Sequence, residues 1–331
     1  MTETLLKIDG LKTYFFTEAG IVKAIDNVSF EVRKGESLGL VGESGSGKTV
    51  TAFSVLGIVP KPGKVVGGKI EFKGENLIGK TEKQMLPLRG TEIAVIFQDP
   101  SSSLNPLYRV ETQLKDVLLA HEKLTKEECH KRIVELLTLV GIPDPEIRMR
   151  EYPHQFSGGM KQRVAIARAL ALEPTLLFAD EPTTALDVTI QAQVLDLLED
   201  LKKKMGMSLV MITHDMGIIA KMTTRVVVMY AGRVCEIAKT EDLYEHPRHP
   251  YTAILLSAVP RLDKKKTLSI IPGNIPNLIE PPSGCRFHPR CEYADAKCEQ
   301  EPPTLEEVGP DHFVACYQWK DLTMKGEKSN K

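Results

Sequence analysis

The stretch ESLGLVGESGSGKTVTAFSVLGIV, residues 36–59, contains an apolar segment, a glycine-rich turn and a segment with helical spacing, in that order. Residues 37–41 are predicted to form a strand, and the residues that follow the turn are predicted to form an amphipathic helix. Gly42, Gly47, Lys48 and Thr49 match the pattern G-x-x-x-x-G-K-[ST]. In this pattern the glycines let backbone N–H groups face a β-phosphate, the lysine reaches the β and γ oxygens, and the hydroxyl binds Mg²⁺. The turn is therefore predicted to bind a nucleoside triphosphate.

Length, net charge and the distribution of apolar residues limit the classes of protein to which the chain can belong. A chain of 331 residues is long for one compact domain and suggests one large domain with an appendage. The net charge is −1, with 43 basic and 44 acidic residues, so we expect no nucleic-acid partner. The N-terminus lacks the pattern of a secretory signal, and no apolar stretch is long enough to span a bilayer. We expect a soluble cytoplasmic protein.

A second apolar segment ends in two carboxylates. TLLFADEP, residues 175–182, has the pattern of a parallel strand that is buried on both faces. Asp180 is placed to hold Mg²⁺ through water, and Glu181 to polarise an attacking water. Taken alone, the stretch is equally compatible with a strand that ends in a solvated acidic turn. The phosphate-binding turn earlier in the chain favours the catalytic interpretation.

A capped helix precedes this strand. In FSGGMKQRVAIARAL, residues 156–170, Ser157 is predicted to cap a long helix whose N-terminus is exposed by Gly158 and Gly159. The N-terminus of a helix attracts phosphate. Its position shortly before the apolar strand favours a role in binding nucleotide over that of an ordinary capped helix.

These stretches, with three others, resemble the nucleotide-binding subunits of ATP-binding cassette (ABC) transporters. The likeness covers roughly residues 5–240 and follows the motif order of that family: Walker A (42–49), Q-loop (Gln98 in VIFQDP), signature (156–160), Walker B with its glutamate (176–181), D-loop (185–187) and switch histidine (His214 in MITHD). The signature reads FSGGM where the family most often has LSGGQ, and Thr184 replaces the usual serine. Both departures keep the serine, the glycines and the aspartate on which the chemistry depends.

The resemblance implies an α/β fold, a P-loop NTPase (ABC ATPase) core with a helical subdomain, an antiparallel β subdomain and a small C-terminal extension. It also implies a head-to-tail dimer in which each ATP is held by Walker A of one cassette and the signature of the other. Glu181 would be the general base, His214 would hold the γ-phosphate, and Gln98 would sense Mg²⁺ together with Thr49 and Asp180. The implied nucleotide-binding residues are Tyr14, Gly42, Glu43, Ser44, Gly45, Ser46, Gly47, Lys48, Thr49, Ser157, Gly158 and Gly159.

An aromatic side chain near the N-terminus is expected to stack on adenine. In LKTYFF, Tyr14 is our choice because of its distance from the phosphate-binding turn, and Phe16 is the alternative. Residues 99–165 have helical periodicity and would form the helical subdomain on which a membrane partner docks.

The C-terminal part of the chain, from residue 249 onwards and called the tail below, indicates one branch of the family. HPYTAILLSAVP (249–260), PSGCRFHPRC (282–291) and HFVACY (312–317) resemble the C-terminal extension of the peptide and nickel permease ATPases. We therefore predict an ABC nucleotide-binding domain at 1–250 and a C-terminal extension at 251–331, with a linker near 263–267 and its own core.

The same resemblance implies a function and a set of partners. The chain would be the ATP-hydrolysing subunit of a di- or oligopeptide importer. It would act with two transmembrane permease subunits, a second ATPase subunit and an extracytoplasmic peptide-binding protein, on the inner face of the membrane. A nickel importer of the same family is one alternative. A soluble ABC ATPase without a membrane partner is the other, but it is disfavoured by the single P-loop and the lack of sustained heptads.

Cysteines cluster in this tail. Cys285, Cys291, Cys298 and Cys316 have the spacing C-x5-C-x6-C-x17-C. The short knuckles typical of structural zinc are missing, so the spacing leaves an iron–sulfur cluster, zinc or unliganded thiols open. The family resemblance implies a [4Fe-4S] cluster, with Zn²⁺ as the alternative. Beside it, the implied cofactors are ATP and Mg²⁺.

Overall fold

The computed structural model describes residues 3–184, 186–257 and 273–320. The chain forms two compact units, one made of residues 1–78 and 211–331 and the other of residues 79–210. The first unit therefore joins the two ends of the chain. The linker predicted near 263–267 and Ala185 of the D-loop lie outside the described residues.

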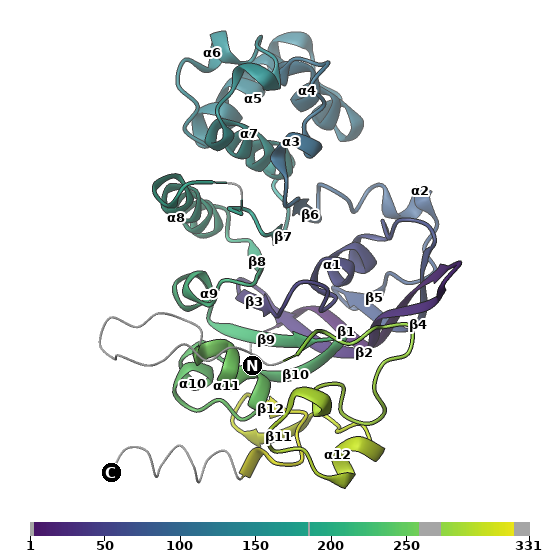
Figure 1. Ribbon diagram of the computed structural model, residues 1–331. Helices are drawn as coiled ribbons and strands as arrows, with labels where there is room; N and C mark the ends of the chain where they lie inside the picture. The colour runs from purple at the N-terminus through teal and green to yellow at the C-terminus, as the bar shows by residue number, and fades with distance from the viewer. Residues whose placement is uncertain (1–2, 185, 258–272, 321–331) are drawn as a thin grey trace. The chain divides into compact units, whose positions relative to one another are not determined.

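An antiparallel sheet in the first unit has the strand order β2-β1-β4-β5 (Figure 1). Its strands are β1 (Thr4–Thr17), β2 (Gly20–Arg33), β4 (Gly63–Phe72) and β5 (Glu75–Asn76). In β1, Ile8 lies opposite Phe30 of β2 on one side and Ile70 of β4 on the other. All three are buried, so this sheet has a continuous apolar face.

The other strands of the first unit include β3 (Ser37–Val41), which leads directly into the phosphate-binding turn. They also include β9 (Arg225–Tyr230), β10 (Arg233–Lys239), β11 (Glu306–Gly309) and β12 (His312–Val314). β3 pairs in parallel with β9, whereas β10 pairs antiparallel with β9 and β12, and β11 with β12. Every residue of β3 and β9 is buried, as expected of parallel strands covered on both faces. Strand β8 (Ser208–Thr213) carries the chain from the second unit into the first.

The helices of the first unit are α1 (Lys48–Leu56), α9 (Met216–Met222), α10 (Thr240–Glu245), α11 (Pro250–Ser257), η2 (His288–Arg290) and α12 (Ala296–Gln300). Several of them, among them α9 and α10, pack against these strands. Figure 1 shows the C-terminal segment, drawn in yellow, beside β10, and the pairing of β10 with β12 makes the tail part of the sheet.

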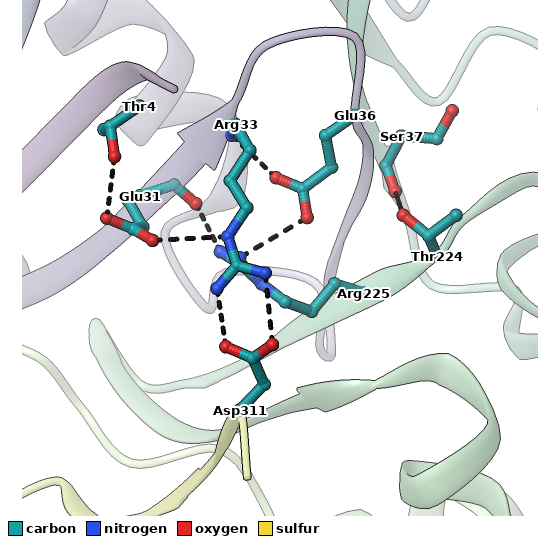
Figure 2. Close-up of polar contacts among 8 residues, drawn as sticks. All are labelled: Thr4, Glu31, Arg33, Glu36, Ser37, Thr224, Arg225 and Asp311. Atoms are coloured by element: carbon teal, nitrogen blue, oxygen red, sulfur yellow. Dashed lines mark hydrogen bonds and ion pairs between the residues drawn. The ribbon is translucent and has the colours of Figure 1, made fainter. Parts of the chain in front are cut away.

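An ion pair also joins the tail to the rest of the first unit. The guanidinium of Arg33 donates to both carboxylate oxygens of Asp311, at 2.5 and 3.2 Å, and Figure 2 shows the two side chains facing each other. The backbone N–H of Arg33 donates to Glu36, whose other oxygen lies 3.5 Å from the guanidinium of Arg225. The β2–β3 turn, β9 and the β11–β12 turn are thus joined by one network of charges.

The second unit combines a parallel strand pair with helices. Its elements are α2 (Glu82–Met85), β6 (Ile93–Ile96), α3 (Pro100–Ser103), α4 (Val110–His121), α5 (Lys126–Leu139), α6 (Pro145–Arg148), η1 (Pro153–Gln155), α7 (Gly158–Leu170), β7 (Leu176–Asp180) and α8 (Val188–Met205). β6 and β7 pair in parallel. The helices from α3 to α7 occupy the region predicted to be helical. Thr125 begins α5 with a capping box closed by Glu128.

The fold class is confirmed: an α/β core, an antiparallel sheet and a helical region are all present. The boundary predicted at residue 250 stays a prediction. Among the helices of the described residues, none has the length and apolar character that a membrane crossing requires.

Candidate active site

The phosphate-binding turn requires glycine at two positions. Gly42 has a φ of 152°, and a Cβ there would lie 2.1 Å from the carbonyl oxygen of Met229. Gly47, the N-cap of α1, has a φ of 103°, and its Cβ would lie 2.8 Å from the carbonyl oxygen of Ala24. Backbone from neighbouring strands therefore presses against the turn at both ends, and only glycine fits there.

The lysine of the turn reaches back across it. Lys48 is 6% exposed, and its Nζ donates to the carbonyl oxygens of Gly42, at 2.7 Å, and Glu43, at 3.0 Å. The same Nζ lies 3.4 Å from the hydroxyl of Ser46. A buried ammonium thus lies in the turn at the N-terminus of α1, where backbone N–H groups favour an anion. Ser44 and Gly45 are exposed, and Thr49 follows the lysine as the second residue of α1.

Glu43 is fixed by two residues from the far end of the sequence. Its backbone N–H donates to the hydroxyl of Tyr251 at 2.8 Å. Its carboxylate accepts from both terminal nitrogens of Arg290, at 2.8 and 3.2 Å. Arg290 belongs to the cysteine-rich tail, so the expectation that the tail has a core independent of the ATP site did not foresee this contact. Sequence reasoning missed both residues, although each lies in a stretch that carried the family resemblance.

Tyr14, the residue predicted to stack on adenine, belongs to a second charged group. Its hydroxyl donates to Asp26 at 3.0 Å, and the other oxygen of Asp26 accepts from Arg286 at 2.7 Å and from Arg233 at 2.9 Å. Burial opposes ionisation of Asp26, but the hydrogen bonds and charges of the arginines outweigh it and lower its pKa. Phe16, the alternative, is 45% exposed. The choice of ring stays a prediction.

In the second unit, the predicted catalytic carboxylate has two neutral hydrogen-bond donors. Glu181 directly follows β7, and the same carboxylate oxygen accepts from Gln98 Nε2 at 2.8 Å and from Thr184 Oγ1 at 2.9 Å. Glu181 has a φ of 44°, in the left-handed region where side chains other than glycine are strained. The predicted Q-loop glutamine and Walker B glutamate are therefore brought together, and Thr184, the departure from the family pattern, donates to the same oxygen of Glu181 as Gln98 does.

The predicted signature lies at an exposed helix end. Ser157 caps α7, and its hydroxyl accepts from the N–H of Met160 at 3.3 Å. A Cβ on Gly159 would lie 2.6 Å from the side chain of Ile190, whereas a Cβ on Gly158 would meet Leu186 at an ordinary 3.6 Å. Gly159 therefore lets α7 approach α8 closely, and Gly158 leaves the helix end open. The first turn of α7 contains no acidic side chain, which favours an anion at this helix end.

The remaining predicted residues lie at strand ends. Asp180 is the last residue of β7 and is 2% exposed. His214 follows β8, is exposed, and precedes Asp215, which caps α9 by accepting from the N–H of Gly217 at 2.7 Å. The roles assigned to these residues in binding γ-phosphate and Mg²⁺ stay predictions.

The four clustered cysteines meet in the tail. They line one pocket of about 10 Å³ together with His249, Phe287 and His288. Burial, and secondly the nearness of the other thiols, raises the pKa of Cys291 to about 11 and that of Cys316 to about 12. Over residues 3–184, 186–257 and 273–320, no group of three or more His, Cys, Asp or Glu side chains is placed to hold a metal ion. The structure thus brings the thiols together but does not form a single-ion site.

A glycine-rich turn between strand and helix, with its lysine, and a carboxylate after a buried parallel strand together define an ATPase of the P-loop class. Comparison with known proteins narrows this class. Residues 25–184 match the family described as ABC transporter, and residues 235–298 match the oligopeptide/dipeptide transporter C-terminal region.

Similar proteins cover nearly the whole chain. A probable peptide ABC transporter ATP-binding protein of Sinorhizobium fredii is 48% identical over 97% of this chain and 96% of its own length. The oligopeptide transport ATP-binding protein OppD of Bacillus subtilis is 50% identical, over 94% of this chain and 87% of its own. The dipeptide transport ATP-binding protein DppD of Escherichia coli is 45% identical, over 95% and 96%.

A solved structure shares the fold. A dimeric bacterial ABC transporter cassette has a TM-score of 0.64 and 27% identity, over 71% of this chain and 98% of its own. The chain therefore belongs to the ABC transporter family, in the branch of the oligopeptide and dipeptide transport ATP-binding proteins, and it is an ABC ATPase.

Proposed function

We propose that this chain hydrolyses ATP to energise the import of dipeptides or oligopeptides across the cell membrane. The observation that carries the proposal is full-length similarity, including the tail, to relatives named for peptide, oligopeptide and dipeptide transport. These names favour peptide cargo over nickel. The chain would act at the inner face of the membrane with two permease subunits, a second ATPase subunit and an extracytoplasmic peptide-binding protein.

The chemistry can be assigned to residues of this chain. Lys48 and the backbone of residues 42–49 bind the phosphates, and Glu181 orients and deprotonates the attacking water. Gln98 and Thr184 both donate to one oxygen of the Glu181 carboxylate and so help to fix its orientation. Mg²⁺, when bound by Thr49, Gln98 and Asp180, neutralises charge on the phosphates. Ser157, Gly158 and Gly159 donate to the γ-phosphate of the nucleotide on the second ATPase subunit.

We also propose that Cys285, Cys291, Cys298 and Cys316 bind a [4Fe-4S] cluster. Four thiols around one pocket are the donor set that such a cluster takes. Each thiolate binds a different iron atom, so the four sulfur atoms do not have to converge on one ion, as zinc would require.

Purification from membranes of the source cell tests the transport proposal. Tagged protein should be isolated together with permease subunits and reconstituted in vesicles with the peptide-binding protein. We expect ATP hydrolysis to rise when dipeptides or longer peptides are added and to be unchanged by Ni²⁺. Stimulation by Ni²⁺ alone, or isolation of the chain without any membrane subunit, would contradict the proposed cargo or the proposed assembly, respectively.

A further inference from the structure

One short segment of the tail holds the phosphate-binding turn. Between Cys285 and Cys291, Arg290 reaches Glu43, the second residue of the turn, through two parallel hydrogen bonds of 2.8 and 3.2 Å. The side chain of Arg290 is 6% exposed, and the hydroxyl of Tyr230 accepts from the same guanidinium at 3.2 Å. Because two partners fix this buried guanidinium, it has one position relative to the turn.

The negative charge of Glu43 is unfavourable in a phosphate-binding turn, and Arg290 neutralises it. The turn favours anions through Lys48 and the N-terminus of α1, yet Glu43 places a carboxylate within it. An unpaired carboxylate there would repel a triphosphate. Burial opposes the charge of Arg290, but the hydrogen bonds to Glu43 and Tyr230 outweigh it and raise the pKa of Arg290. Arg290 is therefore charged at neutral pH, and it cancels the charge of Glu43.

The same segment reaches the predicted adenine side. Arg286 is 4% exposed and donates to Asp26, the carboxylate that also accepts from Tyr14. Two arginines from one seven-residue segment thus contact both groups of first-unit residues that we assign to ATP binding.

We propose that Arg290 is a positioning residue for ATP: it neutralises Glu43 and fixes the phosphate-binding turn, so that the Cys285–Cys291 segment sets the affinity for polyphosphate. This inference rests on the proposed ATP-binding function. Because the effect is one of charge, it depends on the number of phosphates in the ligand. It is also reversed when the carboxylate of Glu43 is removed.

Nucleotide affinity in a set of variants tests this. Titration calorimetry with ATP, ADP and adenosine should be performed on wild type, Arg290→Ala, and Arg290→Ala combined with Glu43→Gln. We expect Arg290→Ala to weaken ATP binding about tenfold, as one uncompensated charge near the phosphates implies, and ADP binding less. Adenosine binding should be unchanged, and the double variant should recover most of the lost ATP affinity.

Asp311→Asn is the matched control, because it breaks another ion pair between the tail and the first unit, away from the turn. It should leave ATP affinity unchanged. Equal loss of ATP and adenosine binding, failure of the double variant to recover, or an unchanged ATP affinity in Arg290→Ala would overturn the inference. A wild-type chain that does not bind ATP would instead overturn the proposed function, and the inference with it.

Discussion

The phosphate-binding turn and the surroundings of Glu181 are held in different ways. In the turn, Lys48 is buried, and Glu43 is fixed at both its backbone and its side chain by residues of the tail. Glu181, in contrast, has a strained backbone and accepts hydrogen bonds from Gln98, which is exposed, and from Thr184. Exposed groups rearrange at lower cost than buried ones. Under the proposed function, the turn would therefore be preformed for binding, whereas the surroundings of Glu181 could adjust during hydrolysis.

Removing the carboxylate proposed to be catalytic should distinguish the two regions most clearly, because it should affect hydrolysis and not binding. Glu181→Gln should lower the rate of ATP hydrolysis by about 10² to 10⁴, because a general base is lost. ATP affinity should be retained, since the turn keeps its contacts. Steady-state hydrolysis and ATP titration on the same preparation check both parts. Hydrolysis at more than half the wild-type rate would contradict the role of Glu181.

The exposed signature should bind the ATP held by the partner cassette and not the ATP of its own cassette. Gly158→Asp should abolish ATP-driven dimerisation, because a carboxylate would face the γ-phosphate across the interface, while the monomer still binds ATP. Gly158→Ala is the matched control, since a Cβ there meets Leu186 at an ordinary 3.6 Å. Light scattering with and without ATP measures dimerisation, and titration measures binding. Equal loss of both in the aspartate variant would mean that the signature folds the helix only.

Substitutions in the Cys285–Cys291 segment should affect both the metal content of the chain and its affinity for nucleotide. Anaerobically purified wild type should contain roughly four iron and four sulfide per chain, and Cys291→Ser should lose them. Because Arg290 precedes Cys291, this variant should also bind ATP more weakly, though by less than the about tenfold expected for Arg290→Ala.

Cys129→Ser, in α5 of the second unit, is the matched thiol control and should change neither property. Stoichiometric zinc without sulfide in the wild type would rule out the cluster. Unchanged ATP affinity in an iron-free Cys291→Ser variant would show that the thiols and the turn are not coupled.

The smallest effect should come from the half-exposed pair of Arg33 and Asp311. The hydrogen bond from Arg33 lowers the pKa of Asp311 below its ordinary 3.8. A lowered folded-state pKa stabilises the fold above the ordinary value, and this contribution is lost as the pH falls through the folded value. Asp311→Asn should therefore lower the urea midpoint slightly at pH 7, by an amount that corresponds to less than about 1 kcal/mol. The two midpoints should converge as the pH falls through the lowered folded-state pKa of Asp311. A difference that grows on acidification would contradict this assignment.

The sequence was sufficient where a property depends on neighbouring residues. Glycine spacing predicted the phosphate-binding turn, the apolar run predicted β7 with its carboxylates, and Ser157 was correctly predicted to cap α7. These features follow from local backbone geometry and burial. The hydrogen bond from Gln98 to Glu181 was not predicted, although the family resemblance had assigned both residues to the ATP site.

Long-range charge pairing could not be predicted in the same way. Arg290 and Glu43 are 247 positions apart, and Arg286 and Asp26 are 260 apart. With 43 basic and 44 acidic residues, nothing local selects one partner for each arginine. The fold makes that choice, by pairing β10 with β12 and so bringing the tail to the first unit.

The pairing of Glu43 with Arg290 also orders events during synthesis of the chain. Ribosomes build proteins from the N-terminus, so Glu43 emerges 247 residues before its partner. At about 5 to 20 residues per second this interval lasts roughly 12 to 50 s. Throughout it, Arg290 is not yet available to pair with Glu43. If Arg290 sets the affinity for ATP as we propose, nucleotide loading should await translation of the tail, and a prematurely terminated chain that lacks Arg290 should compete poorly for ATP.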